Sequence, residues 1–233
     1  MIPIRDRNPS DTFPYITIGI IAINILIFLY ELSLGSGLDV FIMKFGVVPF
    51  KVGHYSQVPE FTFISTFSPF ILSMFLHGGF VHLIGNMWFL WIFGDNIEDK
   101  LGHFEFLGFY ILCGIIASSV HVFFNIQSGT PCIGASGAIA GVLGAYMVTF
   151  PRARVVTIVP LFIFIQVIEL PAIVVLGFWF VIQFFNGAIS ITASTTGAGV
   201  AWWAHIGGFA AGVIILCIIR IFFNKTYRTR RYR

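Results

Sequence analysis

Charge is scarce in this chain. Asp, Glu, Lys and Arg together make up 10% of its 233 residues, whereas an ordinary soluble domain carries about 25%. Cysteine is also rare, and the spacing of Cys113, Cys132 and Cys217 fits neither a disulfide framework nor a metal site. The sequence contains no internal repeats and no low-complexity tract. These absences exclude a large soluble domain and a disulfide scaffold, and they predict that lipid surrounds most of the chain.

Long apolar runs take the place of the missing charge. Hydrophobic residues make up 58% of the chain, its mean hydropathy is +0.93, and a helix needs about 20 apolar residues to cross a bilayer. We predict an all-α, polytopic membrane protein in which residues 1–233 form one domain, with a short segment 1–14 before the first span and a basic tail 223–233. The segment Val155–Glu169 fits either an interfacial connector or part of the fifth span. The six predicted spans are Tyr15–Leu34, Phe75–Phe93, Phe104–Phe124, Gly134–Phe150, Pro171–Gly187 and Gly199–Phe222.

The basic residues are distributed unevenly between the two sides of these spans. With six spans, all but two of the 13 Lys and Arg residues fall on the side of both chain ends, the exceptions being Lys44 and Lys51. The positive-inside rule therefore predicts cytoplasmic termini, and we expect the membrane of a prokaryotic cell. The first span lacks a small-residue cleavage site after it, so we expect it to be retained. The basic tail is interpreted as a topology signal that contacts anionic lipid, with no nucleic acid partner.

A few polar side chains interrupt the apolar segments, and each is a candidate for function. Ser136, within "CIGASGAIAG", opens the fourth span, and His205 lies in the sixth. Both spans run in the same direction, which puts the two residues at a similar depth. Small residues at helical spacing flank both positions and allow close helix approach. These residues are Gly137, Gly141 and Gly144 in span four, and Ala204, Gly208 and Gly212 in span six.

Packing these small-residue faces together would bring the Ser136 hydroxyl toward the His205 imidazole. A serine beside a histidine base is an activated nucleophile. No acidic residue lies at matching depth, so we predict a dyad without a third member. An oxyanion would then be held by the backbone N–H of Ser136, by His82 and by Asn86. The last two are four residues apart in span two and therefore share a helix face.

Three motifs, "FLHGGFVHLIGNMWFLWIFG", "GASGAIAG" and "AHIGGFAAG", together resemble those of the rhomboid intramembrane serine proteases. The similarity runs from about Thr17 to Ile219. It implies a six-helix bundle that cleaves single-span membrane proteins within or near their transmembrane segment, without a cofactor. Span five and the loop "GAISITASTTGAG" resemble that family's gate and cap. By this resemblance the nucleophile is Ser136, the base is His205, the oxyanion residues are His82 and Asn86, and the supporting residues are His77, Gly134 and Gly208.

The chain departs from that family at two places. Ala140 stands where members often carry a Tyr or Phe beneath the imidazole, so His205 needs other support, from packing on the His77 side or from ordered water. A Trp-Arg pair common in the first loop is also missing. Two alternatives stay open: a metal held by His77, His82 and His205, and an inactive relative that binds transmembrane clients. The sequence does not identify the substrate or the oligomeric state.

Overall fold

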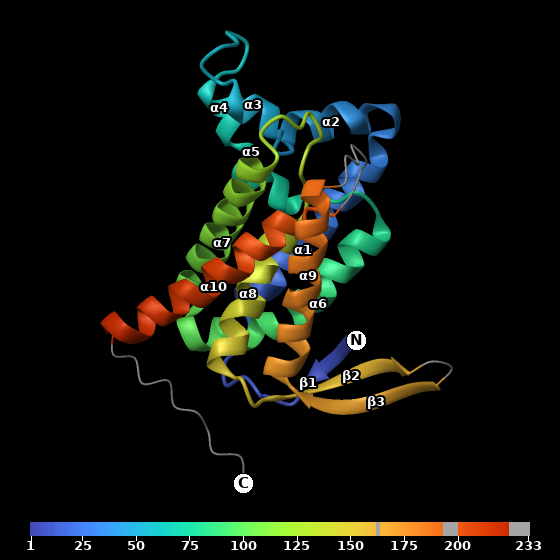
Figure 1. The fold of residues 1–233 in the computed structure, drawn as a ribbon, viewed down its shortest axis with the longest axis vertical. Coiled ribbons are helices and arrows are strands. Elements are labelled where there is room, and N and C mark those ends of the chain that lie inside the picture. Colours follow the sequence, from blue (N-terminus) through green and yellow to red (C-terminus); the bar gives the residue numbers. More distant parts are fainter. Residues whose placement is uncertain (162–163, 193–199, 224–233) are drawn as a thin grey trace.

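The computed structural model describes residues 1–161, 164–192 and 200–223, which form a helical bundle with a small sheet at one end (Figure 1). The short elements of the first loop lie at the other end of the bundle, away from this sheet (Figure 1). In chain order the elements are β1 (Ile2–Asp6), α1 (Tyr15–Ser33), η1 (Gly35–Gly37), α2 (Leu38–Phe45), α3 (Pro49–Gly53), α4 (Phe63–Phe67), α5 (Pro69–Leu72), η2 (Ser73–Phe75), α6 (Phe80–Leu101), α7 (His103–Phe124), α8 (Ser136–Thr149), β2 (Arg154–Leu161), β3 (Phe164–Pro171), α9 (Ala172–Thr192) and α10 (Trp202–Phe223).

The predicted helical membrane bundle is confirmed, while the count of six spans stays a prediction. Among the described residues, α1, α7, α9 and α10 contain the four candidate spans that are long and apolar enough to cross a membrane. A fifth candidate is α6 together with the short helices before it, which meet at a bend of 76°. Helix α8 has 14 residues and falls short of a full span. Each predicted span nevertheless corresponds to one helix, and most helix ends lie within a few residues of the predicted bounds.

The second predicted span is the one whose bounds differ most. Helix α6 begins at Phe80 and continues to Leu101, well beyond the predicted end of the second span at Phe93. Its last turns are polar because they face the start of α1. The buried carboxylate of Glu98 accepts the backbone N–H groups of Ile16 and Thr17 at 2.9 and 2.8 Å. Glu98 thus satisfies donors that have no partner within α1.

The sheet was not predicted from the sequence. Strands β2 and β3 form an antiparallel hairpin, and β1 pairs antiparallel with β2, giving the order β1-β2-β3. The hairpin settles Val155–Glu169 as a connector and excludes it from the fifth span. The Val and Ile residues of this hairpin favour a strand. Its pairing with β1, however, joins segments that are far apart in sequence, and a local pattern does not predict such a pairing. Glu169 of β3 pairs with Arg7 across the sheet at 2.6 Å.

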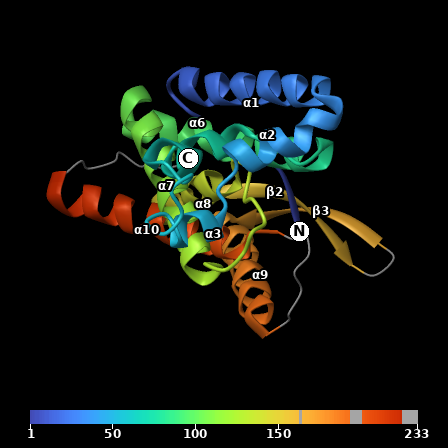
Figure 2. The same ribbon diagram turned by 90° about the horizontal axis from the view of Figure 1, so that it is seen from above.

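Helix α8 lies in the middle of the bundle, with α1 along one edge and α9 along the opposite one (Figure 2). Most of α8 is buried, and it makes its most extensive contact with α10. Glycines permit this contact: a Cβ at Gly208 would overlap the carbonyl of Gly137, and one at Gly212 would overlap that of Gly141. The α8 and α10 backbones therefore touch directly, as the small-residue faces predicted.

Candidate active site

Ser136 is the first residue of α8, at a turn that its neighbours fix. Gly134 has φ +119°, which L side chains rarely adopt, and its N–H donates to the Ser73 carbonyl at 2.9 Å. The chain then enters the helix at Ser136. The first N–H groups of a helix have no partner within it. The Ser136 hydroxyl and its backbone N–H therefore lie together at the helix start.

The structure brings the two residues of the predicted dyad together. His205 is in the first turn of α10, and its Nε2 lies 2.9 Å from the Ser136 Oγ. Both residues, and His82 in the first turn of α6, lie near the start of their helices. His205 is 9% exposed, so water has little access to the imidazole. The hydroxyl can donate to Nε2, which is the arrangement that a serine nucleophile and a histidine base require.

Residues of α9 and α10 contact the ring of His205 and its second nitrogen, Nδ1. His205 Nδ1 lies 2.7 Å from the buried Gln183 Oε1. The rings of Trp179 and Trp202 lie 5.8 and 6.2 Å from the imidazole, centroid to centroid. These residues provide support for the imidazole that Ala140 does not. Gln183 was absent from the predicted site, although an amide within an apolar span is itself a signal.

His82 and Asn86 both face the turn at Gly134. The Gly78 N–H donates to His82 Nδ1 at 3.4 Å, which leaves the ring proton on Nε2. A Cβ at Gly134 would lie 2.7 Å from that Nε2 and 3.6 Å from the Asn86 Nδ2. Only a glycine leaves room for both side chains here. Two side-chain donors thus reach the turn that precedes Ser136, as an oxyanion site requires.

His77 lies behind this pair and contacts Asn86. The Asn86 Nδ2 donates to His77 Nε2 at 2.9 Å, and the His77 ring packs edge-on against His82 at 5.0 Å. The backbone N–H of His77 points to the buried Glu31 carboxylate, 3.2 and 3.3 Å from its two oxygens. Glu31 was not predicted from the sequence. His77 therefore orients Asn86 and does not pack against His205.

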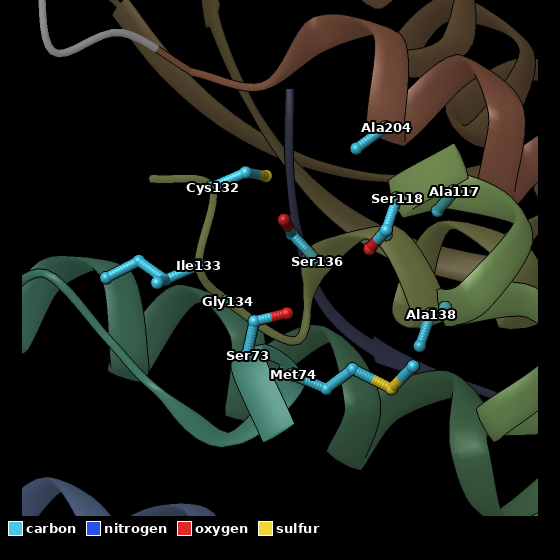
Figure 3. Close-up of a pocket in the computed structure, with 12 residues that line it drawn as sticks. Ser73, Met74, Ala117, Ser118, Cys132, Ile133, Gly134, Ser136, Ala138 and Ala204 are labelled. Atoms are coloured by element: carbon cyan, nitrogen blue, oxygen red, sulfur yellow. The ribbon is translucent and has the colours of Figure 1, made fainter. Parts of the chain in front are cut away.

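A small cavity lies beside Ser136 (Figure 3). Its volume is about 10 Å³, enough for about one water molecule. Ser136 lines it together with Ser73, Ser118 and Cys132. A polypeptide does not fit in this volume.

The described residues do not favour the three-histidine metal site. No group of three or more His, Cys, Asp or Glu side chains with metal-site geometry occurs in residues 1–161, 164–192 and 200–223. His205 directs one nitrogen at Ser136 and the other at Gln183. Neither nitrogen of His205 is left for a ligand role beside His77 and His82.

Comparison with known proteins connects this chain to a family. A family model described as "Rhomboid domain" matches residues 65–222. The human presenilin-associated rhomboid-like protein, mitochondrial, is 32% identical over 154 residues, which cover 63% of this chain and 36% of that protein. Rhomboid protein 1, mitochondrial, of Saccharomyces cerevisiae is 31% identical over 151 residues, covering 61% and 39%. The chain thus spans little more than a third of the length of these relatives.

The relatives' names contradict the predicted location in a prokaryotic cell membrane with cytoplasmic termini. Both the human and the yeast protein are mitochondrial by name. The physical reason for the error is that basic residues show only which loops share a side of a membrane. Hydropathy and charge are alike in spans of bacterial and mitochondrial membranes, so they could not identify the compartment.

Proposed function

Because the chain belongs to the rhomboid family, we propose that it is an intramembrane serine endopeptidase formed by a single membrane domain over residues 1–233. Ser136 is its nucleophile and His205 its general base. The observation that carries this proposal is the 2.9 Å contact between Ser136 Oγ, at the start of α8, and His205 Nε2, in the first turn of α10. The reaction needs water and no cofactor.

In the first half of the reaction, Ser136 Oγ attacks the carbonyl carbon of the substrate peptide bond. His205 Nε2 takes the hydroxyl proton and then gives it to the departing amine. The C–N bond breaks, and the substrate's new carboxyl end stays attached to Ser136 as an ester. In the second half, water attacks this ester, gives a proton to His205, and releases the acid while Ser136 regains its hydrogen.

The charge on the carbonyl oxygen in each half needs donors close to Ser136. The backbone N–H of Ser136 and the side chains of His82 and Asn86 face that position from two helices. Loss of one such donor typically slows a reaction by ~10²–10³. The contact between Asn86 and His77 holds the amide in place before substrate arrives.

The substrate class that we propose is a single-span membrane protein, cut within or near its transmembrane segment. The nucleophile lies at the first turn of a buried helix, among helices apolar enough to cross a bilayer. We place the enzyme in a mitochondrial membrane, following the names of the relatives.

The test is cleavage of a reporter in proteoliposomes. The reporter is a single-span membrane protein with small residues near the end of its transmembrane segment. We expect the wild type to cut it and Ser136→Ala to leave it intact. Ser118→Ala is the matched control, because Ser118 lines the same cavity from α7; it should cleave at close to the wild-type rate. Reporter that binds the wild type but is never cut would replace this proposal with the client-binding alternative.

A further inference from the structure

Gln183 is a buried polar side chain that the proposed reaction does not yet use. It lies on α9, within the apolar stretch "GFWFVIQFFNG", and is 7% exposed. Its Oε1 lies 2.7 Å from His205 Nδ1, on the side of the imidazole opposite Ser136. Burying an amide among apolar side chains is unfavourable unless it is hydrogen-bonded. The bond to His205 offsets that cost, so the two side chains constrain one another.

The contact decides which ring nitrogen carries the proton. A neutral imidazole has one N–H donor and one acceptor nitrogen. An amide oxygen is an acceptor only, so His205 Nδ1 must be the donor. Nε2 then presents its lone pair to the Ser136 hydroxyl, which is the tautomer that a general base needs. With the proton on Nε2, the imidazole could not accept the serine proton.

We propose that Gln183 is a positioning residue that holds His205 in the base tautomer and orients its ring toward Ser136. This inference rests on the proposed function. In serine hydrolases with three members, a buried carboxylate does this work and also stabilises the imidazolium. Here a neutral amide provides the acceptor, without burying a full charge in a membrane helix. The predicted absence of a third member took only acidic residues into account.

Packing around the ring agrees with this role. Trp179 lies one helical turn before Gln183 on α9, and its ring contacts the same imidazole. Trp202 contacts the imidazole from its own helix, α10. The two tryptophans restrict the tilt of the imidazole ring. Gln183 fixes the rotation of the ring and holds its proton on Nδ1. Helix α9 therefore determines whether the Ser136–His205 contact is productive.

The experiment compares Gln183→Leu and Gln183→Glu with the wild type. Leucine removes the acceptor while keeping the volume, and we expect serine labelling by a fluorophosphonate probe to slow by roughly 10- to 100-fold. Glutamate keeps an acceptor at the same place and should restore at least part of the rate. Asn186→Leu is the matched control, since it removes another amide from α9 and should label at close to the wild-type rate.

A second readout reports the tautomer directly. Nitrogen-15 NMR of histidine-labelled protein distinguishes Nδ1–H from Nε2–H, and the His205 signals are those that His205→Gln removes. We expect the Nδ1–H form in the wild type and a mixture in Gln183→Leu. An Nε2–H form in the wild type, or equal labelling of Gln183→Leu and the wild type, would overturn the role of Gln183. Absence of any Ser136 labelling in the wild type would instead refute the proposed function. The NMR measurement of the His205 tautomer would still test the role of Gln183 in that case.

Discussion

The direct contact between the α8 and α10 backbones leads to a sharp prediction for Gly208→Ala. The new Cβ would overlap the carbonyl of Gly137, which is part of a helix backbone and cannot rotate away. Carbon atoms normally stay about 3.5 Å or more apart, so the two helices must separate by about 1 Å or more. The hydrogen bond of 2.9 Å between Ser136 and His205 joins these same helices. That separation would lengthen it beyond the usual limit.

A misplacement of about 1 Å can cost roughly 100-fold in rate. We therefore expect Gly208→Ala to slow fluorophosphonate labelling of Ser136 by about that factor. Overpacking should also lower the free energy of unfolding by about 1–3 kcal/mol. Labelling rates in detergent and a thermal unfolding midpoint measure the two effects separately.

Gly177→Ala provides the control, because no heavy atom lies within 4 Å of its added Cβ. Alanine favours helix over glycine by roughly 1 kcal/mol, so this variant should be no less stable than the wild type and should label normally. Wild-type labelling by a folded Gly208→Ala protein would refute the reasoning, since the helix contact would then not control the dyad.

Three other predictions follow from single contacts. Asn86→Ala should slow reporter cleavage by ~10²–10³ yet leave more activity than Ser136→Ala; equal loss in the two variants would argue against a role limited to the oxyanion. Burial raises the pKa of Asp6 to about 7, so the folded state keeps a proton that the unfolded state loses, and stability should fall as pH rises from about 4 to about 7. Asp6→Asn should reduce this fall, as thermal midpoints across that range would show, and an unchanged pH dependence would contradict the assignment. Glu98→Ala removes the acceptor of two backbone N–H groups and should cost about 1–3 kcal/mol of stability; a midpoint equal to the wild type would show that the cap is not needed.

The long helices could be predicted from the sequence because each depends on a local apolar run. Helix α1 was expected at Tyr15–Leu34 and is observed at Tyr15–Ser33. The contact of Ser136 with His205 was predictable for a similar reason. Small residues at helical spacing indicate which faces meet, and Gly208 and Gly212 do meet the α8 backbone.

The sheet and the end of α6 depend on contacts between distant segments, which no local pattern shows. Strand β1 pairs with β2 across most of the chain. The polar turns of α6 are helical because Glu98 binds the start of α1. Gln183 was missed for another reason: apolar residues flank it directly on both sides, and its partner His205 lies 22 residues away on the next helix.

The central claim is that His205 activates Ser136. The most direct measurement exposes the purified protein to a fluorophosphonate probe and locates the adduct by mass spectrometry. We predict an adduct on Ser136 in the wild type, and none on any serine of folded Ser136→Ala or His205→Ala protein. A folded wild-type protein without an adduct, or labelling of Ser136 that persists in His205→Ala, would contradict the account.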